Sequence, residues 1–194
     1  MISARGVGRR FGARRALEPV DFDLGRGGFL VVTGANGSGK TTLLRLCAGL
    51  LIPTAGVLEV GVERAQVGYL AHEPLVYREL TALENLDLYG RLYRIHERRE
   101  RIGMLLERFG LWDVRNERAG DYSRGMLQRL ALCRTLLHEP DLLILDEPAN
   151  ALDAAGVELL EHELGELRRE HTLLVASHAP ERLAPFATGR LALA

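Results

Sequence analysis

Cysteine is scarce in this chain of 194 residues, which has two, Cys47 and Cys133. They lie far apart inside apolar, helix-like stretches, and neither belongs to a CxxC pair or to a cluster with the spacing of metal ligands. This pattern argues against a metal site built on cysteine. We expect both residues to be reduced thiols in the core.

Long hydrophobic runs are absent as well. A membrane crossing takes about 20 apolar residues, whereas the most apolar run, residues 43–53, is shorter and contains Arg45. The N-terminus lacks the pattern of a signal peptide, because its arginines lead into no apolar segment. We therefore expect a cytoplasmic protein without direct membrane insertion, which contacts a membrane only through a partner.

An excess of charge of one sign is also missing, since the formal net charge is -1 at pH 7. Nucleic-acid-binding proteins use an excess of positive charge to attract phosphates, so we predict no nucleic-acid partner. The arginine-rich residues 91–101 include acidic residues, which favours a solvated helix face over a nucleic-acid or lipid patch. The length and the ordinary composition indicate one globular domain.

Three short apolar runs, residues 29–33, 142–145 and 172–176, alternate with longer helical patterns. Such runs are typical of strands covered on both faces, so the sequence predicts an α/β fold with a mostly parallel central sheet. Each run ends in polar residues, and ligands of open α/β sheets bind beyond the carboxyl ends of the strands. We expect the three polar clusters to share one site.

Other segments predict the rest of the fold. Residues 57–60 and 66–70 look like strands of a small antiparallel β layer, and residues 43–51 look like a helix whose leucines, including Leu50, face the core. From about Thr81 the pattern changes to helix, and Thr81 forms a capping box with Glu84, so we expect an inserted helical subdomain. We expect one domain over residues 1–194. Within it, residues 1–72 and 138–194 form the nucleotide-binding core, and residues 73–137 form the helical subdomain.

The first polar cluster, residues 34–41, matches the phosphate-loop pattern GxxxxGK(S/T) between a predicted strand and a predicted helix. Glycines let successive N–H groups point at phosphate oxygens, and the helix N-terminus adds its positive dipole end. Lys40 is expected to reach the β- and γ-phosphates, and Thr41 to hold Mg²⁺. The predicted nucleotide contacts are Gly34, Ala35, Asn36, Gly37, Ser38, Gly39, Lys40, Thr41 and Thr42. Alone, the pattern indicates an NTPase or kinase, and a glycine-rich turn without a ligand is the alternative.

The second cluster is Asp146 and Glu147, at the end of the second apolar run. Beside a phosphate loop, one carboxylate can hold Mg²⁺ through water, and its neighbour can orient and deprotonate the attacking water. We assign these roles to Asp146 and Glu147 in that order. The alternative is that both acids only stabilise a helix N-terminus.

Residues 142–148, with residues 151–153 and 177–178 further on, resemble the Walker B, D-loop and H-loop series of ABC ATPases. Residues 122–129, YSRGMLQR, resemble their signature motif, LSGGQxQR. The resemblance runs in the family's order through nearly the whole chain. It implies a homodimer in which Ser123 and Gly125 of one copy contact the ATP held by the phosphate loop of the other.

The resemblance also implies roles for single residues. Glu147 would be the general base, His178 would contact the γ-phosphate within its own subunit, and Asp153 would couple the two sites. Phe11 stands where the family usually has an aromatic ring that stacks on adenine. The alternatives are a satisfied histidine at a strand end for His178 and a core aromatic for Phe11.

The sequence departs from the family in two places. The signature has Arg124 and Met126 where members commonly have Gly and Gln, although Ser123 and Gly125 are retained. His72 occupies the slot of a glutamine that links Mg²⁺ and the attacking water to the transport partner. With residues 80–86, this histidine resembles the ATP-binding subunit of the haem exporter of cytochrome c maturation, while a solvated loop residue is the alternative.

The resemblance implies an ATPase subunit on the cytoplasmic face of the cell membrane, bound to membrane-spanning permease subunits. Export is the expected direction, with haem the most specific cargo and drugs, lipids or polysaccharides as alternatives. A soluble ABC ATPase of iron-sulphur assembly or DNA repair is a rival from another class. A P-loop kinase would leave residues 123–128 and His178 unexplained.

Overall fold

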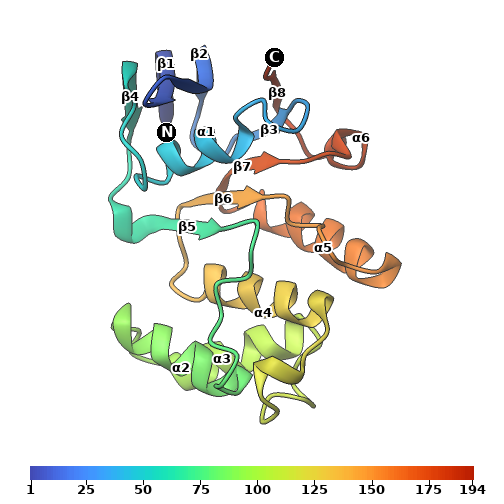
Figure 1. Ribbon diagram of the computed structural model, residues 1–194. Coiled ribbons are helices and arrows are strands. Elements are labelled where there is room, and N and C mark those ends of the chain that lie inside the picture. Colours follow the sequence, from blue (N-terminus) through green and yellow to red (C-terminus); the bar gives the residue numbers. More distant parts are fainter.

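The computed structural model describes residues 1–194 and contains two sheets (Figure 1). The larger sheet has the order β5-β6-β7-β3-β8, and every neighbouring pair is parallel. Its strands are β3 (Phe29–Thr33), β5 (Val67–Leu70), β6 (Leu142–Asp146), β7 (Thr172–Ala176) and β8 (Gly189–Ala192). All residues of β3, β6 and β7 are buried, which confirms the predicted parallel sheet covered on both faces.

The smaller sheet is antiparallel and has the order β2-β1-β4. Its strands are β1 (Ile2–Phe11), β2 (Arg14–Leu24) and β4 (Ala55–Val60). The prediction that residues 57–60 and 66–70 share this layer is wrong, because β5 pairs with β6 of the parallel sheet. A short 3-10 turn, Arg64–Gln66, separates the two strands, and Gln66 Nε2 donates a hydrogen bond of 2.6 Å to Asp141 beside the start of β6.

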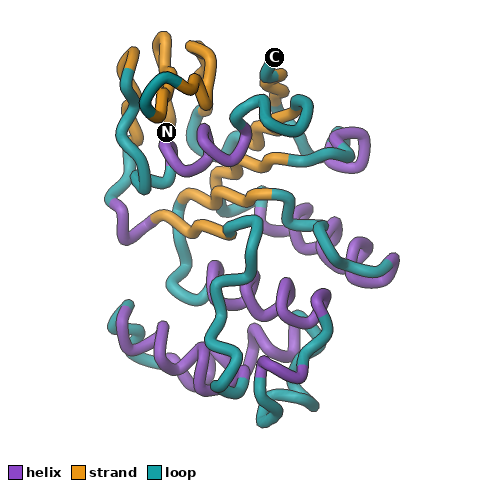
Figure 2. The backbone as a smooth tube through the Cα atoms, in the orientation of Figure 1, coloured by secondary structure: helices purple, strands orange, loops and turns teal.

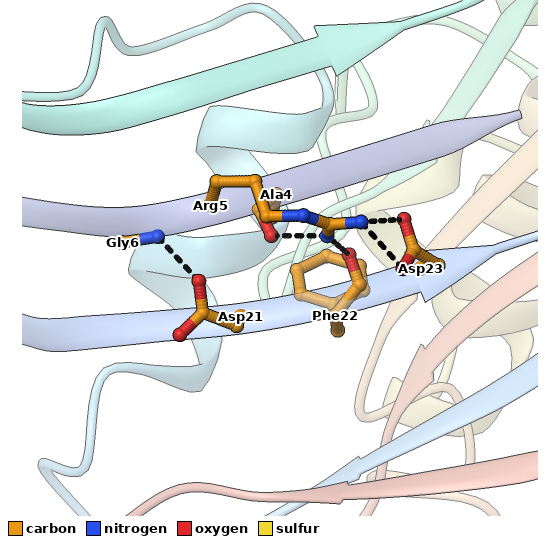
Figure 3. Close-up of polar contacts among 6 residues, drawn as sticks. All are labelled: Ala4, Arg5, Gly6, Asp21, Phe22 and Asp23. Atoms are coloured by element: carbon orange, nitrogen blue, oxygen red, sulfur yellow. Dashed lines mark hydrogen bonds and ion pairs between the residues drawn. The ribbon is translucent and has the colours of Figure 1, made fainter.

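β1 is not among the predicted strands because a bulge breaks its alternation of buried and exposed residues. Gly6 adopts a φ of 59°, and the pairing with β2 shifts register between Ala4 and Val7. Figure 3 shows how side chains fix the bulged pair: the Gly6 N–H donates to Asp21 Oδ1 at 2.7 Å, and Arg5 reaches both carboxylate oxygens of Asp23.

Six α-helices accompany the sheets. They are α1 (Lys40–Cys47), α2 (Ala82–Leu92), α3 (Arg98–Arg108), α4 (Arg124–Leu136), α5 (Ala154–Leu167) and α6 (Pro180–Leu183). Figure 2 shows α2, α3 and α4 gathered on the side of the parallel sheet that faces away from the antiparallel sheet. Thr81 and Glu84 form the predicted capping box at the start of α2. None of the helices combines the length and apolar character that a membrane span requires.

α1 is shorter than predicted. It ends at Cys47, and Gly49 follows with a φ of 67°, so the chain turns away from the helix axis. Leu50 is therefore 45% exposed, and the prediction that it faces the core is wrong.

Alternate residues of the parallel strands pack into two apolar cores, one on each face of the sheet. Val31, Leu143 and Val175 lie in the core with α2 to α5, whereas Val32 and Ile144 lie in the core with α1 and the antiparallel sheet. Both cysteines are free and buried, as predicted. The two packed faces hold the carboxyl ends of β3 and β6 in fixed relative positions, and the polar clusters follow these ends.

Candidate active site

The phosphate loop joins β3 to α1 in a conformation that depends on glycine. Gly39, the N-cap of α1, has a φ of 99°, and a Cβ built on it would lie 2.6 Å from the Ala16 carbonyl oxygen. L-amino acids with side chains rarely adopt this conformation, and the contact is too short for any side chain. The glycine therefore lets the backbone of β2 approach the loop closely.

Lys40 is the chain's only lysine and is 7% exposed. Its Nζ donates hydrogen bonds to the carbonyl oxygens of Gly34, at 2.8 Å, and Ala35, at 3.3 Å. The ammonium group is thus held over the loop by neutral acceptors and has no carboxylate partner. A phosphate oxygen would supply the missing negative charge.

A hollow of about 290 Å³ opens above the loop and collects most of the predicted site residues. Its lining includes Lys40, Thr41, Thr42, Asn36, Gly37, Gly39, His72, Asp146, Glu147 and His178. Residues from four separate parts of the chain therefore meet at the carboxyl ends of the parallel strands, the expected place for a ligand. Arg14 and Ala16 of β2 complete the lining, and no sequence motif pointed to them.

A larger hollow, of about 810 Å³, lies between α3 and α5. Its three arginines, Arg101, Arg108 and Arg169, each form an ion pair with a glutamate. Because no arginine there is free to bind an anion, the smaller hollow above the phosphate loop is the better phosphate site.

Asp146, the last residue of β6, is 1% exposed, and neither of its carboxylate oxygens has a hydrogen-bond partner. A buried carboxylate without partners is unfavourable unless a cation or donor approaches it. Thr41 lines the same hollow. No group of three or more His, Cys, Asp or Glu side chains is arranged to hold a metal. This donor set fits Mg²⁺, which binds through one or two protein oxygens and the substrate's phosphates.

Glu147 has an unusual backbone, with a φ of 53°. Holding a residue other than glycine there costs on the order of 1–3 kcal/mol, and the neighbouring contacts maintain it. The Glu147 N–H donates to the Ala176 carbonyl at 3.1 Å, and its Oε2 accepts the His178 N–H at 3.0 Å. The His178 ring also lies close, with Nε2 3.2 Å from Glu147 Oε1. The carboxylate is thus aimed into the hollow with its side chain 12% exposed.

His72 is exposed at the rim of the hollow. Its Nε2 lies 3.5 Å from the side-chain nitrogen of Asn150, in the loop that follows β6. The histidine therefore contacts the segment that carries the two acidic residues. Asn150 was not among the predicted site residues, because nothing in its local sequence indicates a contact with a residue so distant in the chain.

Seven predicted site residues do not line the hollow: Gly34, Ala35 and Ser38 of the phosphate loop, and Phe11, Ser123, Gly125 and Asp153 from other parts of the chain. Ser123 is exposed and caps α4, accepting the Met126 N–H at 3.2 Å, and Asp153 caps α5, accepting the Gly156 N–H at 2.8 Å. Gly125 lies beside the Ala151 carbonyl. Phe11 is 48% exposed under the guanidinium of Arg9, so the alternative of a core aromatic is wrong. If Phe11, Ser123, Gly125 and Asp153 touch nucleotide, they do so from outside this hollow.

Comparisons with known proteins agree with the phosphate-loop geometry. A family model described as ABC transporter matches residues 17–150. The ABC transporter ATP-binding protein NatA of Bacillus subtilis (strain 168) is 36% identical over 200 residues, which cover 94% of this chain and 81% of NatA.

Two further relatives carry names that state a substrate. The bacitracin transport ATP-binding protein BcrA of Bacillus licheniformis is 33% identical over 92% of this chain and 61% of its own length. The aliphatic sulfonates import ATP-binding protein SsuB 1 of Burkholderia cenocepacia (strain HI2424) is 36% identical over 99% of this chain and 63% of its own length. The chain thus spans less than two thirds of these two relatives.

The fold is similar to solved structures of ATP-binding cassettes. One is the dimeric structure of a post-hydrolysis state of the cassette MJ0796 bound to ADP and Pi, with a TM-score of 0.88, 27% sequence identity, and coverage of 100% of this chain and 94% of that chain. The family model, the relatives and this structure agree with the phosphate loop and the acidic residues beside it. The chain therefore belongs to the ABC transporter family and is an ATP-binding subunit that hydrolyses ATP.

Proposed function

We propose that two copies of this chain bind Mg·ATP head to tail and drive transport through separate permease subunits at the cytoplasmic face of a membrane. The observation that carries this proposal is the division of the site. Lys40, Asp146 and Glu147 line one hollow, whereas the exposed Ser123 lies outside it, on the surface. A second copy could therefore bring its signature residues to the open side of the nucleotide.

In this arrangement each residue has a defined task. The glycine-rich loop and Lys40 bind the β- and γ-phosphates, and Thr41 and Asp146 hold Mg²⁺, which neutralises charge on the phosphate oxygens. Glu147 accepts a proton from the attacking water. His178, now 3.2 Å from Glu147, contacts the γ-phosphate. Asp153, beside the partner's site, couples the two sites through the α5 cap.

Phe11 would supply the adenine contact. Its ring is exposed at the end of β1, just before the turn to β2, and β2 contributes Arg14 and Ala16 to the hollow. An exposed aromatic ring beside a phosphate site can stack on a purine. Phe11→Ala is expected to weaken ATP binding more than binding of inorganic triphosphate, which lacks the base.

Chemical cross-linking tests the head-to-tail arrangement. With Asn36→Cys and Ser123→Cys in one Glu147→Gln chain, a bis-maleimide should link two copies only when Mg·ATP is present. The native Cys47 and Cys133 are buried and give little background. A matched control places the first cysteine at Glu59 on the distant β4, where no nucleotide-dependent link is expected. Equal cross-linking with and without Mg·ATP would contradict the proposal.

We propose export as the direction of transport and haem as the narrower candidate cargo. Both rest on His72 and residues 80–86, which resemble the haem exporter subunit. BcrA is named for bacitracin transport and SsuB 1 for sulfonate import, so direction must be measured. In inverted vesicles that contain the permease, export predicts ATP-dependent accumulation of haem. Accumulation only in right-side-out vesicles would overturn the proposed direction, and accumulation of bacitracin instead would replace the cargo.

Co-purification separates transport from a soluble role. We expect the tagged chain, extracted from membranes with mild detergent, to retain a membrane-spanning protein at a stoichiometry of about one permease half per chain. Quantitative recovery of the active chain without any membrane-spanning partner would favour a soluble ABC ATPase.

A further inference from the structure

The signature helix α4 touches the catalytic loop of its own subunit, the loop of residues 147–153. Gln128 lies five residues after Ser123, the N-cap of α4, and is 2% exposed. Its Nε2 donates a hydrogen bond of 3.1 Å to the carbonyl oxygen of Pro148. Pro148 directly follows Glu147 in the chain. One buried hydrogen bond thus joins the signature helix to the residue beside the proposed base.

A second contact joins the same two segments. A Cβ built on Gly125, in the first turn of α4, would lie 3.2 Å from the Ala151 carbonyl oxygen and 3.8 Å from the Leu152 side chain. The helix therefore packs against the far end of the catalytic loop as well as its beginning. Figure 1 shows α4 next to the parallel sheet, near the loop that leads from β6 to α5.

Gln128 anchors Pro148 through the one backbone polar group that this proline has. Proline has no N–H group, so the carbonyl is the only backbone polar group of this buried residue. A buried carbonyl that loses its donor is unfavourable, which holds Gln128 and Pro148 together. Glu147 has a φ of 53° and its N–H is bonded to Ala176. A displacement of α4 that moves Pro148 must therefore change how Glu147 points into the hollow.

We infer that Gln128 is a positioning residue that makes hydrolysis at one nucleotide site depend on ATP at the other. This inference rests on the proposed head-to-tail dimer. In that dimer, Ser123 and Gly125 touch the ATP bound by the partner, while Gln128 of the same helix holds the loop that carries its own subunit's Glu147. ATP at the partner's site fixes α4, and α4 fixes the base of the other site.

Mixed dimers test this inference. Two differently tagged copies are co-expressed and purified through both tags, and one copy carries Glu147→Gln, so that a single active Glu147 remains. Gln128→Met is then placed in either copy, because methionine keeps the length of the side chain and favours helix but removes the donor. The readout is phosphate release in a single turnover, started by Mg²⁺.

The inference predicts a loss in one arrangement only. With Gln128→Met in the copy that has the active Glu147, the rate should fall at least about fivefold, the effect of one unsatisfied buried carbonyl. With Gln128→Met in the other copy, the rate should stay within about twofold. Thr135→Val, which also removes a buried side-chain bond of α4, serves as the control and should have little effect in either copy.

Other patterns would overturn the inference. A loss only when Gln128→Met is in the copy with Glu147→Gln would mean that the residue merely supports the signature contact across the interface. If Gln128→Met gave the same rate of phosphate release in either copy, Gln128 would have no role in positioning Glu147. The parent mixed dimer separates this from the proposed function: if it forms and hydrolyses ATP, the proposed dimer stands and the variants decide, whereas if no mixed dimer forms with Mg·ATP, the proposed function itself falls.

Discussion

Replacing Glu147 with glutamine removes one proton acceptor and little else. The side chain keeps its size, and the new amide oxygen can still accept the His178 N–H, now bonded to Oε2 at 3.0 Å. The loop should therefore keep its conformation, including the φ of 53° at residue 147. Lys40 and Asp146 are untouched, so binding of Mg·ATP should persist.

The expected loss of rate follows from the chemistry of proton transfer. A positioned general base contributes about 10²–10⁴-fold, so the Glu147→Gln barrier should rise by about 3–5 kcal/mol. Because binding persists while hydrolysis is slow, a nucleotide-bound dimer should accumulate. Single-turnover phosphate release measures the rate, and gel filtration with Mg·ATP measures the dimer.

A matched carboxylate-to-amide change controls for the loss of charge. Glu161 pairs with Arg182 at 2.9 Å on the surface, and surface pairs contribute about 0–1 kcal/mol. Glu161→Gln should therefore hydrolyse ATP at close to the parent rate. If Glu147→Gln turned over within about threefold of the parent, Glu147 would not be the base and the assignment of the catalytic carboxylate would be wrong.

Three further predictions concern stability and coupling. Gly39→Ala should lower the free energy of unfolding by about 2–5 kcal/mol, because its Cβ would lie 2.6 Å from the Ala16 oxygen; Gly37→Ala, with open space around it, should lose less in urea titrations. His72→Ala should keep ATP affinity but lose ATP-driven transport in vesicles. Unchanged transport would mean that His72 is a solvated loop residue without a role in coupling. Burial, followed by the charge of Arg134, lowers the pKa of His138. The contribution of the neutral His138 to stability is therefore complete above about pH 6.5 and is lost as the pH falls through the pKa of His138 in the folded protein. The His138→Phe variant can still stack on Tyr93, so its free energy of unfolding should fall less than that of the parent between pH 7.5 and pH 5.5.

The parts of the fold with strong local signals could be predicted from the sequence. β3, β6 and β7 are continuous apolar runs, and Thr81 and Glu84 stand at the spacing of a capping box. The antiparallel sheet could not be assembled in this way. The bulge at Gly6 breaks the alternation of β1, and the turn at Arg64–Gln66 sends β4 and β5 to different sheets.

The functional site likewise contains some residues that short sequence patterns predict and others that they do not. The phosphate loop, the acidic pair, His72 and His178 were predicted from short patterns, and the fold brings them to one hollow. Gln128 is recognisable from the sequence only as part of the signature motif, because its bond to Pro148 joins residues 20 apart and exists only once α4 packs against the loop. Arg14 and Ala16 lie on a strand that carries no nucleotide-binding pattern.

Covalent labelling of Lys40 tests the central claim most directly. The chain has one lysine, so an acyl phosphate of ATP, which transfers its acyl group to a nearby amine, can modify only Lys40 among the side chains. The account predicts that mass spectrometry finds the acyl group on Lys40 and that excess Mg·ATP prevents the labelling. Absence of the label on Lys40, or labelling that excess Mg·ATP leaves unchanged, would show that this loop does not hold the triphosphate.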